Sequence, residues 1–166
     1  MSSSLAIRCY IALGSNLNDP IKQVQSALHF IGTLPQTKLI RYSRFYRNPP
    51  FYPPPQPDYI NAVVAIDTHL TAHQLLKYLQ HIEKQHGRTR HTVRFGPRTL
   101  DLDLLLYGDL SINTPKLVVP HPGLAARNFV LYPLAEIAPE LQLPDGRSLQ
   151  DLLSQCPATD LEVLNN

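Results

Sequence analysis

Apolar and polar residues follow two periods along the chain, an alternation typical of strands and a three-to-four-residue spacing typical of helices. Strand patterns cover residues 5–14, 38–48, 58–70 and the second half of 94–108. The first of these is apolar on both faces and is predicted to be a central strand. The second alternates as expected of a strand with one solvent-facing side.

Two helical patterns lie between these strands. Asn18 or Asp19 is predicted to cap the first helix, and Gly32 to end it. Thr71 is predicted to cap the second helix, which ends at Gly87. The resulting order, β-α-β-β-α-β, predicts an α/β (α+β) sandwich with a ferredoxin-like core, in which helices pack on one side of a mainly antiparallel sheet.

The rest of the chain predicts C-terminal additions to this core. A hairpin-like stretch near Gly108 is followed by a helix at 129–138 and a short helix after Ser148. The proline-rich segment 49–57 lies between two strands that are expected to pair, so it does not separate domains. We expect one domain over residues 1–166.

Composition narrows the class of protein. Of the 166 residues, 43% are hydrophobic and 17% charged, with a net charge of +2. This is a globular composition, too weakly charged to indicate a nucleic-acid or membrane partner. Cys9 and Cys156 lack metal-ligand spacing and are expected to be reduced. Because no stretch has the length of a membrane span and the N-terminus has no basic leader, we expect a cytoplasmic protein.

Two carboxylates interrupt the most apolar strand. Asp101 and Asp103 are two positions apart, so they share one face, about 7 Å from each other, while Leu100, Leu102 and Leu104 share the opposite face. A solvent-facing side would account for the alternation. However, the leucine run 104–106 indicates burial on both faces just beyond, where paired carboxylates repel unless a cation relieves them. Magnesium, with its preference for oxygen ligands and substrate phosphates, fits this pair.

An arginine-rich loop runs into the same strand. It contains Arg88, Arg90, Arg94 and Arg98, with His91 among them. A solvated loop and a nucleic-acid contact are both possible readings. Beside a predicted cation site, however, guanidinium groups are suited to binding a polyphosphate. No GxxxxGK[ST] motif occurs, so phosphoryl transfer outside the P-loop class is the leading hypothesis.

Three residues could bind a flat heterocycle. Tyr59 and Asn61 share a strand face, where an aromatic ring can stack on a heterocycle and an amide can match its edge. Phe129 could form the opposite wall. Each also has an ordinary structural explanation, and singly that explanation is preferred. His121, between two prolines, is a candidate phosphate contact or general acid.

Several stretches together resemble the 6-hydroxymethyl-7,8-dihydropterin pyrophosphokinases of folate biosynthesis. They are "IALGSN", "FYRNPP…QPDYINAVV", "RFGPRTLDLDLLLYG" and "VPHPGLAARNFVLYPLAEIAPEL", spread from Ile11 to Gly146. The resemblance implies a diphosphotransferase that uses ATP to pyrophosphorylate the pterin hydroxymethyl group and releases AMP. It also implies that Asp101 and Asp103 hold two Mg²⁺ ions bridging the ATP phosphates.

The remaining site residues are also assigned by this resemblance. Catalytic roles beside the two aspartates would fall to Arg88, Arg90 and Arg98. The residues expected to bind ATP are Gln80, Glu83, Arg90, Arg98, Leu104, Lys116, His121 and Arg127. Those expected to bind the pterin are Asn48, Pro49, Phe51, Tyr59, Asn61 and Phe129, with the ring stacked between Tyr59 and Phe129.

This chain departs from the family pattern at several positions. His91 and Phe95 stand where lysine and tryptophan are frequent, Lys116 replaces a frequent arginine, and Asn48 stands where threonine is common. These departures bear on loop closure and ATP affinity. We expect a monomer acting on ATP and a dihydropterin, with no nucleic-acid or membrane partner. The alternative is a non-catalytic ferredoxin-like module that binds RNA or an acidic partner through its basic loop.

Overall fold

The computed structural model describes residues 5–50, 55–87 and 99–164. Within these ranges the chain forms strands, α-helices and one 3₁₀ turn. In chain order they are β1 (Ile7–Ser15), α1 (Pro20–Gly32), β2 (Thr37–Tyr42), β3 (Tyr46–Asn48), β4 (Tyr59–Thr68), α2 (Ala72–Gln85), β5 (Asp101–Tyr107), β6 (Ile112–Asn113), β7 (Val118–Val119), the 3₁₀ turn η1 (Leu124–Ala126), α3 (Asn128–Ile137), α4 (Leu149–Ser154) and β8 (Glu162–Val163).

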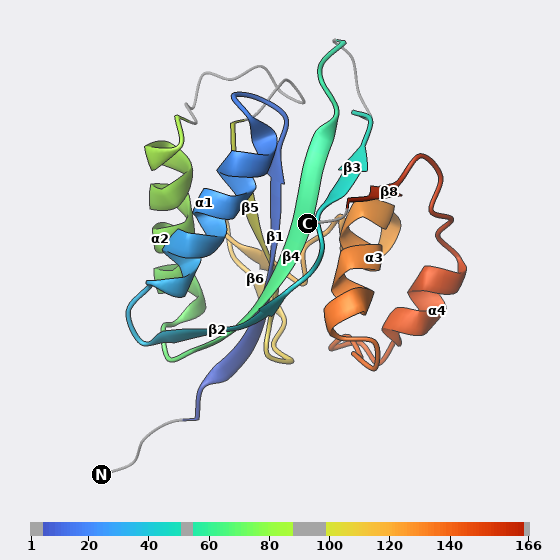
Figure 1. The fold of residues 1–166 in the computed structure, drawn as a ribbon. Helices are drawn as coiled ribbons and strands as arrows, with labels where there is room; N and C mark the ends of the chain where they lie inside the picture. The colour runs from blue at the N-terminus through green and yellow to red at the C-terminus, as the bar shows by residue number, and fades with distance from the viewer. Residues whose placement is uncertain (1–4, 51–54, 88–98, 165–166) are drawn as a thin grey trace.

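The main sheet is antiparallel, with the strand order β5-β1-β4-β3-β8, and β2 also pairs with β4. β1 and β4 form its centre, as the apolar pattern of the first strand predicts (Figure 1). β6 and β7 form a separate two-stranded sheet. The predicted mainly antiparallel α/β architecture is therefore confirmed.

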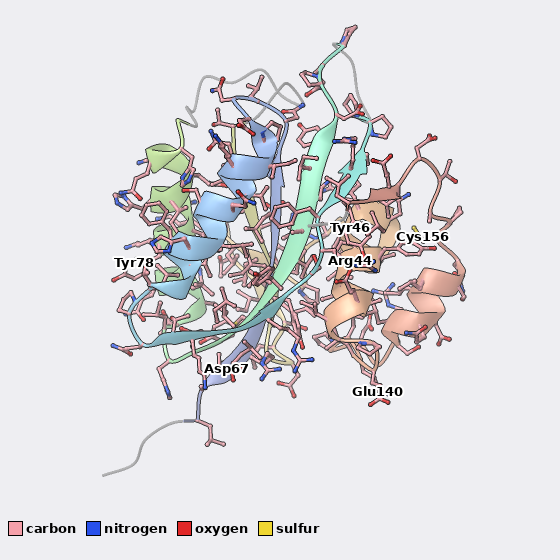
Figure 2. All side chains as sticks on the ribbon, viewed as in Figure 1. Arg44, Tyr46, Asp67, Tyr78, Glu140 and Cys156 are labelled. Atoms are coloured by element: carbon pink, nitrogen blue, oxygen red, sulfur yellow. The ribbon has the colours of Figure 1, made fainter. Side chains whose placement is uncertain are left out.

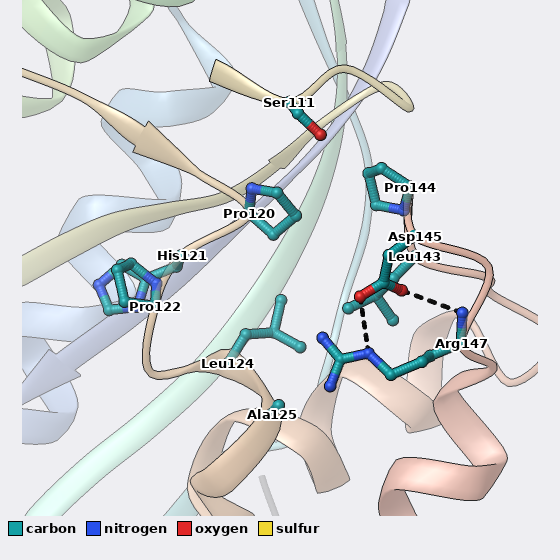
Figure 3. Close-up of a pocket in the computed structure, with 10 residues that line it drawn as sticks. All are labelled: Ser111, Pro120, His121, Pro122, Leu124, Ala125, Leu143, Pro144, Asp145 and Arg147. Carbon is teal, nitrogen blue, oxygen red and sulfur yellow. Dashed lines mark hydrogen bonds and ion pairs between the residues drawn. The ribbon is translucent and has the colours of Figure 1, made fainter. Parts of the chain in front are cut away.

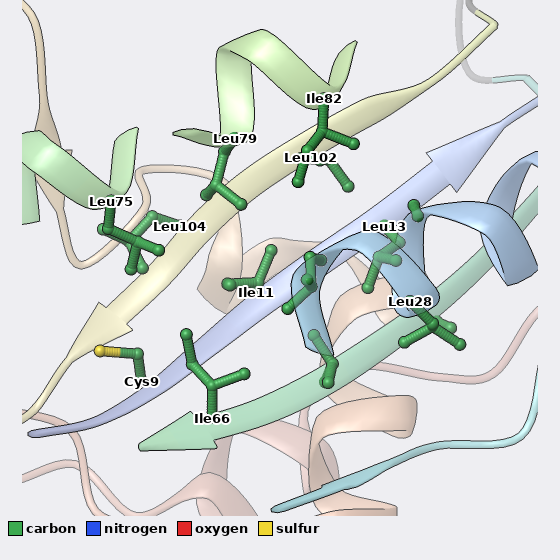
Figure 4. Close-up of a cluster of buried hydrophobic side chains, with 14 of the residues drawn as sticks. Cys9, Ile11, Leu13, Leu28, Ile66, Leu75, Leu79, Ile82, Leu102 and Leu104 are labelled. Atoms are coloured by element: carbon green, nitrogen blue, oxygen red, sulfur yellow. The ribbon is translucent and has the colours of Figure 1, made fainter. Parts of the chain in front are cut away.

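Helices α1 and α2 cover one face of the main sheet (Figure 1). Alternate residues of the central strands point into this interface, where burying apolar surface is the main source of stability. Its members include Cys9, Ile11, Leu13, Ile66, Leu75, Leu79, Leu102 and Leu104 (Figure 4). We call this set the helix-covered core.

The opposite face is only partly covered. Helix α3 packs over β4 and β3, and α4 packs on α3 (Figure 1). Beneath α3 lies a second apolar cluster that includes Tyr10, Val63, Ala65 and Leu105. Tyr46 and Arg44 border it (Figure 2), and Glu136 of α3 accepts hydrogen bonds from the Tyr46 hydroxyl at 2.5 Å and the Arg44 amide at 2.8 Å. The predicted one-sided helix packing is thus incomplete, because α3 occupies this other face.

Several local predictions can be compared with the structure. Thr71 caps α2, as predicted, and it shares a capping box with Gln74. Asp19 is the N-cap residue of α1, as predicted, but its backbone is left-handed (φ 63°) and its side chain makes no capping hydrogen bond. The single strand predicted over 38–48 is two strands, and β8 was not predicted. Cys9 and Cys156 are free thiols.

Candidate active site

One row of residues crosses four strands on the face of the main sheet against which α3 packs, which we call the α3 face. In register, Asp101 of β5 faces Gly14 of β1, Gly14 faces Asn61 of β4, and Asn61 faces Tyr46 of β3. The next position along places Asp103 opposite Ala12. The sheet therefore brings together the predicted metal ligands and the predicted heterocycle-binding amide, which are 40 residues or more apart in sequence.

The two carboxylates share a face, as predicted. Asp101 and Asp103 are half-buried, whereas Leu102 and Leu104 are buried in the helix-covered core. The facing β1 residues, Gly14 and Ala12, have little or no side chain. Carboxylate oxygens on an open floor suit a hard cation such as magnesium. No group of three or more His, Cys, Asp or Glu side chains among the described residues could hold a metal ion.

Strand β5 is the edge of the sheet, yet two of its outward backbone groups have partners. The Leu102 amide, between the two aspartates, donates to Glu83 Oε2 on α2 at 2.8 Å. The His121 amide donates to the Leu105 carbonyl at 3.0 Å. Glu83 is buried, and a carboxylate is seldom buried unless it has a partner. The two contacts hold the carboxylate-bearing strand between α2 and the loop after β7.

The hydrogen bonds of His121 define its tautomer. The Gly123 amide donates to Nδ1 at 3.0 Å, so the neutral ring carries its proton on Nε2. Nε2 lies 3.9 Å from Asp103 Oδ2. Burial lowers the pKa of His121; Asp103 opposes this shift, and the charge of Arg127 adds to it. We therefore interpret the pair as a neutral donor beside a carboxylate, not as an ion pair.

Arg127 lies between a glycine and an aromatic ring. Its guanidinium carbon is 5.9 Å from the centroid of Phe129, within the range of a cation–π contact. On its other side, a Cβ atom at Gly123 would come within 2.6 Å of the guanidinium. Arg127 and Phe129 flank the start of α3, so a predicted ATP contact and a predicted pterin wall touch each other.

Three of the residues predicted to bind the heterocycle, Asn48, Tyr59 and Asn61, lie on β3 and β4. The Asn61 amide group donates to Asn48 Oδ1, and both side chains are buried. Tyr59 is half-buried at the start of β4, and its hydroxyl is 3.5 Å from Gln56 Oε1. That amide oxygen also accepts a 2.8 Å bond from Asn16 Nδ2. Tyr59 is thus tied to the turn that follows β1.

The other predicted residues fall into three groups. Gln80, on α2, and Lys116, between β6 and β7, are exposed. Leu104 is buried in the helix-covered core, with its side chain on the face opposite the carboxylates, so its predicted adenine contact stays a prediction. Pro49 is exposed directly after β3. Phe51, Arg88, Arg90, His91, Phe95 and Arg98 lie outside the described residues.

Gly14, Ala12 and Gly123 belong to this site but were not predicted. Their contribution is space, and a small residue carries no chemical signal in a sequence. A Cβ atom at Gly14 would lie 2.9 Å from Asn61 Oδ1. This requirement follows from the β1–β4 register, which cannot be read from the sequence.

A separate pocket of about 300 Å³ adjoins His121 (Figure 3). Leu143 and Pro144 form part of the opposite wall, and Arg147 Nε donates to Asp145 Oδ2 there at 2.7 Å. Neither β5 carboxylate lines it. The pocket therefore shares His121 with the candidate active site but is separate from the surface that carries Asp101 and Asp103.

The fold is shared with solved HPPK-DHPS chains. It matches solved structures of *Plasmodium falciparum* HPPK-DHPS, including the wild type with pteroate (TM-score 0.73, 12% identity) and a triple mutant (TM-score 0.73, 14% identity). In the first match, 93% of this chain aligns with 43% of the solved chain. At such low identity, these matches establish the fold alone.

Sequence comparison gives the particular family. The model of 7,8-dihydro-6-hydroxymethylpterin-pyrophosphokinase (HPPK) matches residues 10–139. A *Pseudomonas aeruginosa* 2-amino-4-hydroxy-6-hydroxymethyldihydropteridine pyrophosphokinase is 50% identical over 95% of this chain and 96% of its own length. The *Haemophilus influenzae* enzyme of the same name is 48% identical over 90% of this chain and 92% of its own. The chain belongs to the HPPK family.

Proposed function

We propose that this protein transfers a pyrophosphoryl group from ATP to the hydroxymethyl group of 6-hydroxymethyl-7,8-dihydropterin, giving the pterin diphosphate and AMP in folate biosynthesis. One observation carries the proposal: the sheet register places Asp101 and Asp103 on the same face as Asn61, two strands away. A phosphate-binding group and a heterocycle-binding amide within one site are what this reaction requires. The RNA-binding alternative has no support among the relatives, which are named as pyrophosphokinases.

Asp101 and Asp103 would hold Mg²⁺, and two ions are proposed. The donor set fits, because both side chains are oxygen ligands on an open floor beside a predicted polyphosphate site. Bound Mg²⁺ would neutralise phosphate charge and orient the groups that react. Positioning of this kind supplies most of the catalysis in phosphoryl transfer.

ATP would lie along the β5 edge. The Nε2–H of His121 and the guanidinium of Arg127 would donate to phosphate oxygens. Glu83 joins α2 to β5 by accepting a hydrogen bond from the Leu102 amide, so its role is in part structural. Contacts from Gln80, Leu104 and Lys116 are proposed from the family pattern. We propose, from the same family pattern, that Arg88, Arg90 and Arg98 contact phosphates and take part in loop closure.

The pterin would occupy the end of the sheet beside β3. Asn61 and the backbone at Asn48 and Pro49 would bind its edge, and Tyr59 and Phe129 would stack on its ring. Phe51 completes the proposed set. We further propose a cytoplasmic, monomeric, single-domain enzyme with a ferredoxin-like core, supported by the antiparallel order β5-β1-β4-β3. No helix within the described residues is long and apolar enough to cross a membrane.

Phosphorus NMR would test the reaction directly. Purified protein, ATP, Mg²⁺ and the dihydropterin should yield AMP and a pterin diphosphate. Asp103→Asn should suppress both products, whereas Asp109→Asn, at an exposed position just beyond the same strand, should not. ADP as the product would contradict pyrophosphoryl transfer. Unchanged ATP with folded protein would contradict the proposed activity altogether.

A further inference from the structure

We propose that the Asn48 side chain is a positioning residue that fixes which end of the Asn61 amide faces the substrate, and thereby selects a heterocycle with an N–H donor at that edge. The inference rests on the pterin-binding role proposed for Asn61. It concerns a residue whose family counterpart is often threonine. The proposal depends on a chain of directed hydrogen bonds beginning at a backbone carbonyl.

Asn48 and Asn61 are adjacent on the α3 face of the sheet. Asn61 pairs in register with Tyr46, and Asn48 pairs with Tyr59, so the two asparagines are diagonal neighbours across β3 and β4. Their exposed fractions are 4% and 6%, respectively. Because burial leaves little water to satisfy either amide, their mutual orientation has a large energetic consequence.

The direction of the chain follows from donor and acceptor chemistry. The Pro49 carbonyl can only accept, so the Asn48 atom 3.0 Å from it must be the amide nitrogen. The other terminal atom of Asn48 is therefore its oxygen, which can also only accept. The Asn61 atom bonded to that oxygen must then be Nδ2. Rotating either amide by 180° would bring two acceptors or two donors together.

This arrangement leaves the Asn61 carbonyl pointing over β1. Its Oδ1 lies 2.9 Å from the position that a Cβ atom would occupy at Gly14, so the glycine leaves that space open. No described residue donates a hydrogen bond to this oxygen. The site thus presents a fixed acceptor on the side nearer Asp101, which is also paired with Gly14. A ligand must offer an N–H there, whereas a ring carbonyl would be repelled.

A hydroxyl group can replace Asn48 in this role. Threonine can donate to the Pro49 carbonyl and accept from Asn61 Nδ2, so it can transmit the same direction. Valine has nearly the same shape as threonine but has no hydroxyl, so it cannot transmit the direction of the hydrogen bonds. Asn48→Thr and Asn48→Val therefore form a matched pair that differs in the hydroxyl alone. Ser43→Ala, at another buried polar position near β3, controls for the loss of a structural hydrogen bond.

The test measures affinity for two ligands by calorimetry, with α,β-methylene ATP and Mg²⁺ present to prevent turnover. One ligand is 6-hydroxymethylpterin, and the other is its 2-oxo counterpart, in which a carbonyl replaces the amino donor. We expect the wild type to prefer the pterin by at least about 100-fold. Asn48→Thr and Ser43→Ala should keep this ratio within about threefold, whereas Asn48→Val should reduce it to below about tenfold, because a freed Asn61 amide can turn either end to the ligand.

Equal ratios for folded Asn48→Thr and Asn48→Val would overturn the inference. If Asn48→Val does not fold, Asn48→Ala tests the same loss of direction with a smaller side chain, and an unchanged ratio there would also overturn it. A wild type that binds neither ligand would contradict the proposed function instead. Failure of the two proposals is therefore distinguishable.

Discussion

The α3 face of the sheet has polar residues at both ends, and the two ends are built differently. At one end Arg8 and Asp67 face each other across β1 and β4, with Arg8 Nε 2.5 Å from Asp67 Oδ1. At the other end Asp101 and Asp103 place two like charges on one strand. Apolar residues beneath α3 separate the ends.

This difference distinguishes polar residues that serve the fold from polar residues that serve a ligand. Opposite charges at the Arg8–Asp67 end compensate each other within the protein. Like charges at the other end repel each other, and a bound cation would relieve that repulsion. The carboxylates lie opposite Gly14 and Ala12, which leave space above the sheet. We infer that this end is organised for a substrate, and each prediction below tests that contrast.

The largest effect is expected from Asp101→Ala. Turnover should fall by at least about 1,000-fold, because the carboxylate proposed to position metal and phosphates is lost. Thermal stability should be unchanged or slightly higher, since like-charge repulsion is relieved. Steady-state kinetics and a melting curve on the same preparation would check both. Reduced stability with normal turnover in the folded fraction would show that the aspartate is structural.

Ile66→Ala should have the opposite profile. Ile66 is fully buried in the helix-covered core, and truncation should lower the free energy of unfolding by about 2–5 kcal/mol. It lies in β4 near Asp67, remote from the carboxylates in strand register. Urea unfolding would measure the loss, and the folded fraction should keep its kcat. A large drop in kcat below the denaturation range would contradict the separation of the two regions.

Glu83 of α2, on the helix-covered side, bonds to the strand that carries the two aspartates. Its variants therefore sharpen the comparison between residues that stabilise the fold and residues that bind a ligand. Glu83→Ala removes the acceptor for the Leu102 amide and should cost about 1–3 kcal/mol of stability. Glu83→Gln keeps an oxygen acceptor and should recover most of that loss. Denaturant unfolding of both variants, with the KM for ATP, would divide structural from binding roles. Equal stability of the two variants would show that the hydrogen bond contributes little.

Local features of this fold were predictable because their causes are local. The alternation in β5 predicted that Asp101 and Asp103 share a face, and the Thr71 capping box lies within four residues. The left-handed backbone at Asp19 was not predictable, because propensity favours aspartate at a cap without fixing its φ angle. The short strand β8 depends on pairing with β3, more than 100 residues earlier.

The candidate site was predicted as a set of residues but not as a geometry. Asn61 was expected to bind a heterocycle, yet its bond to Asn48 depends on the β3–β4 register. Likewise, the contact between Glu83 and the Leu102 amide needs α2 to pack beside an edge strand. Resemblance can transfer roles between sequences. It does not specify the direction in which a particular amide points.

The smallest effect is expected from Asp67→Asn. The hydrogen bond from Arg8 holds the pKa of Asp67 below its ordinary value. A depressed carboxyl pKa adds stability that is fully present above the unfolded pKa, near 4, and is lost as pH falls through the folded pKa. Since the pair is partly exposed, its contribution should be below about 1 kcal/mol. The difference in the free energy of unfolding between wild type and variant, measured with urea at pH 7 and pH 3, should therefore shrink toward zero on acidification. Turnover at pH 7 should be unchanged. A difference that stays constant with pH would mean that the Arg8 contact does not stabilise the ionised carboxyl, and the contrast between the two ends would lose its electrostatic basis.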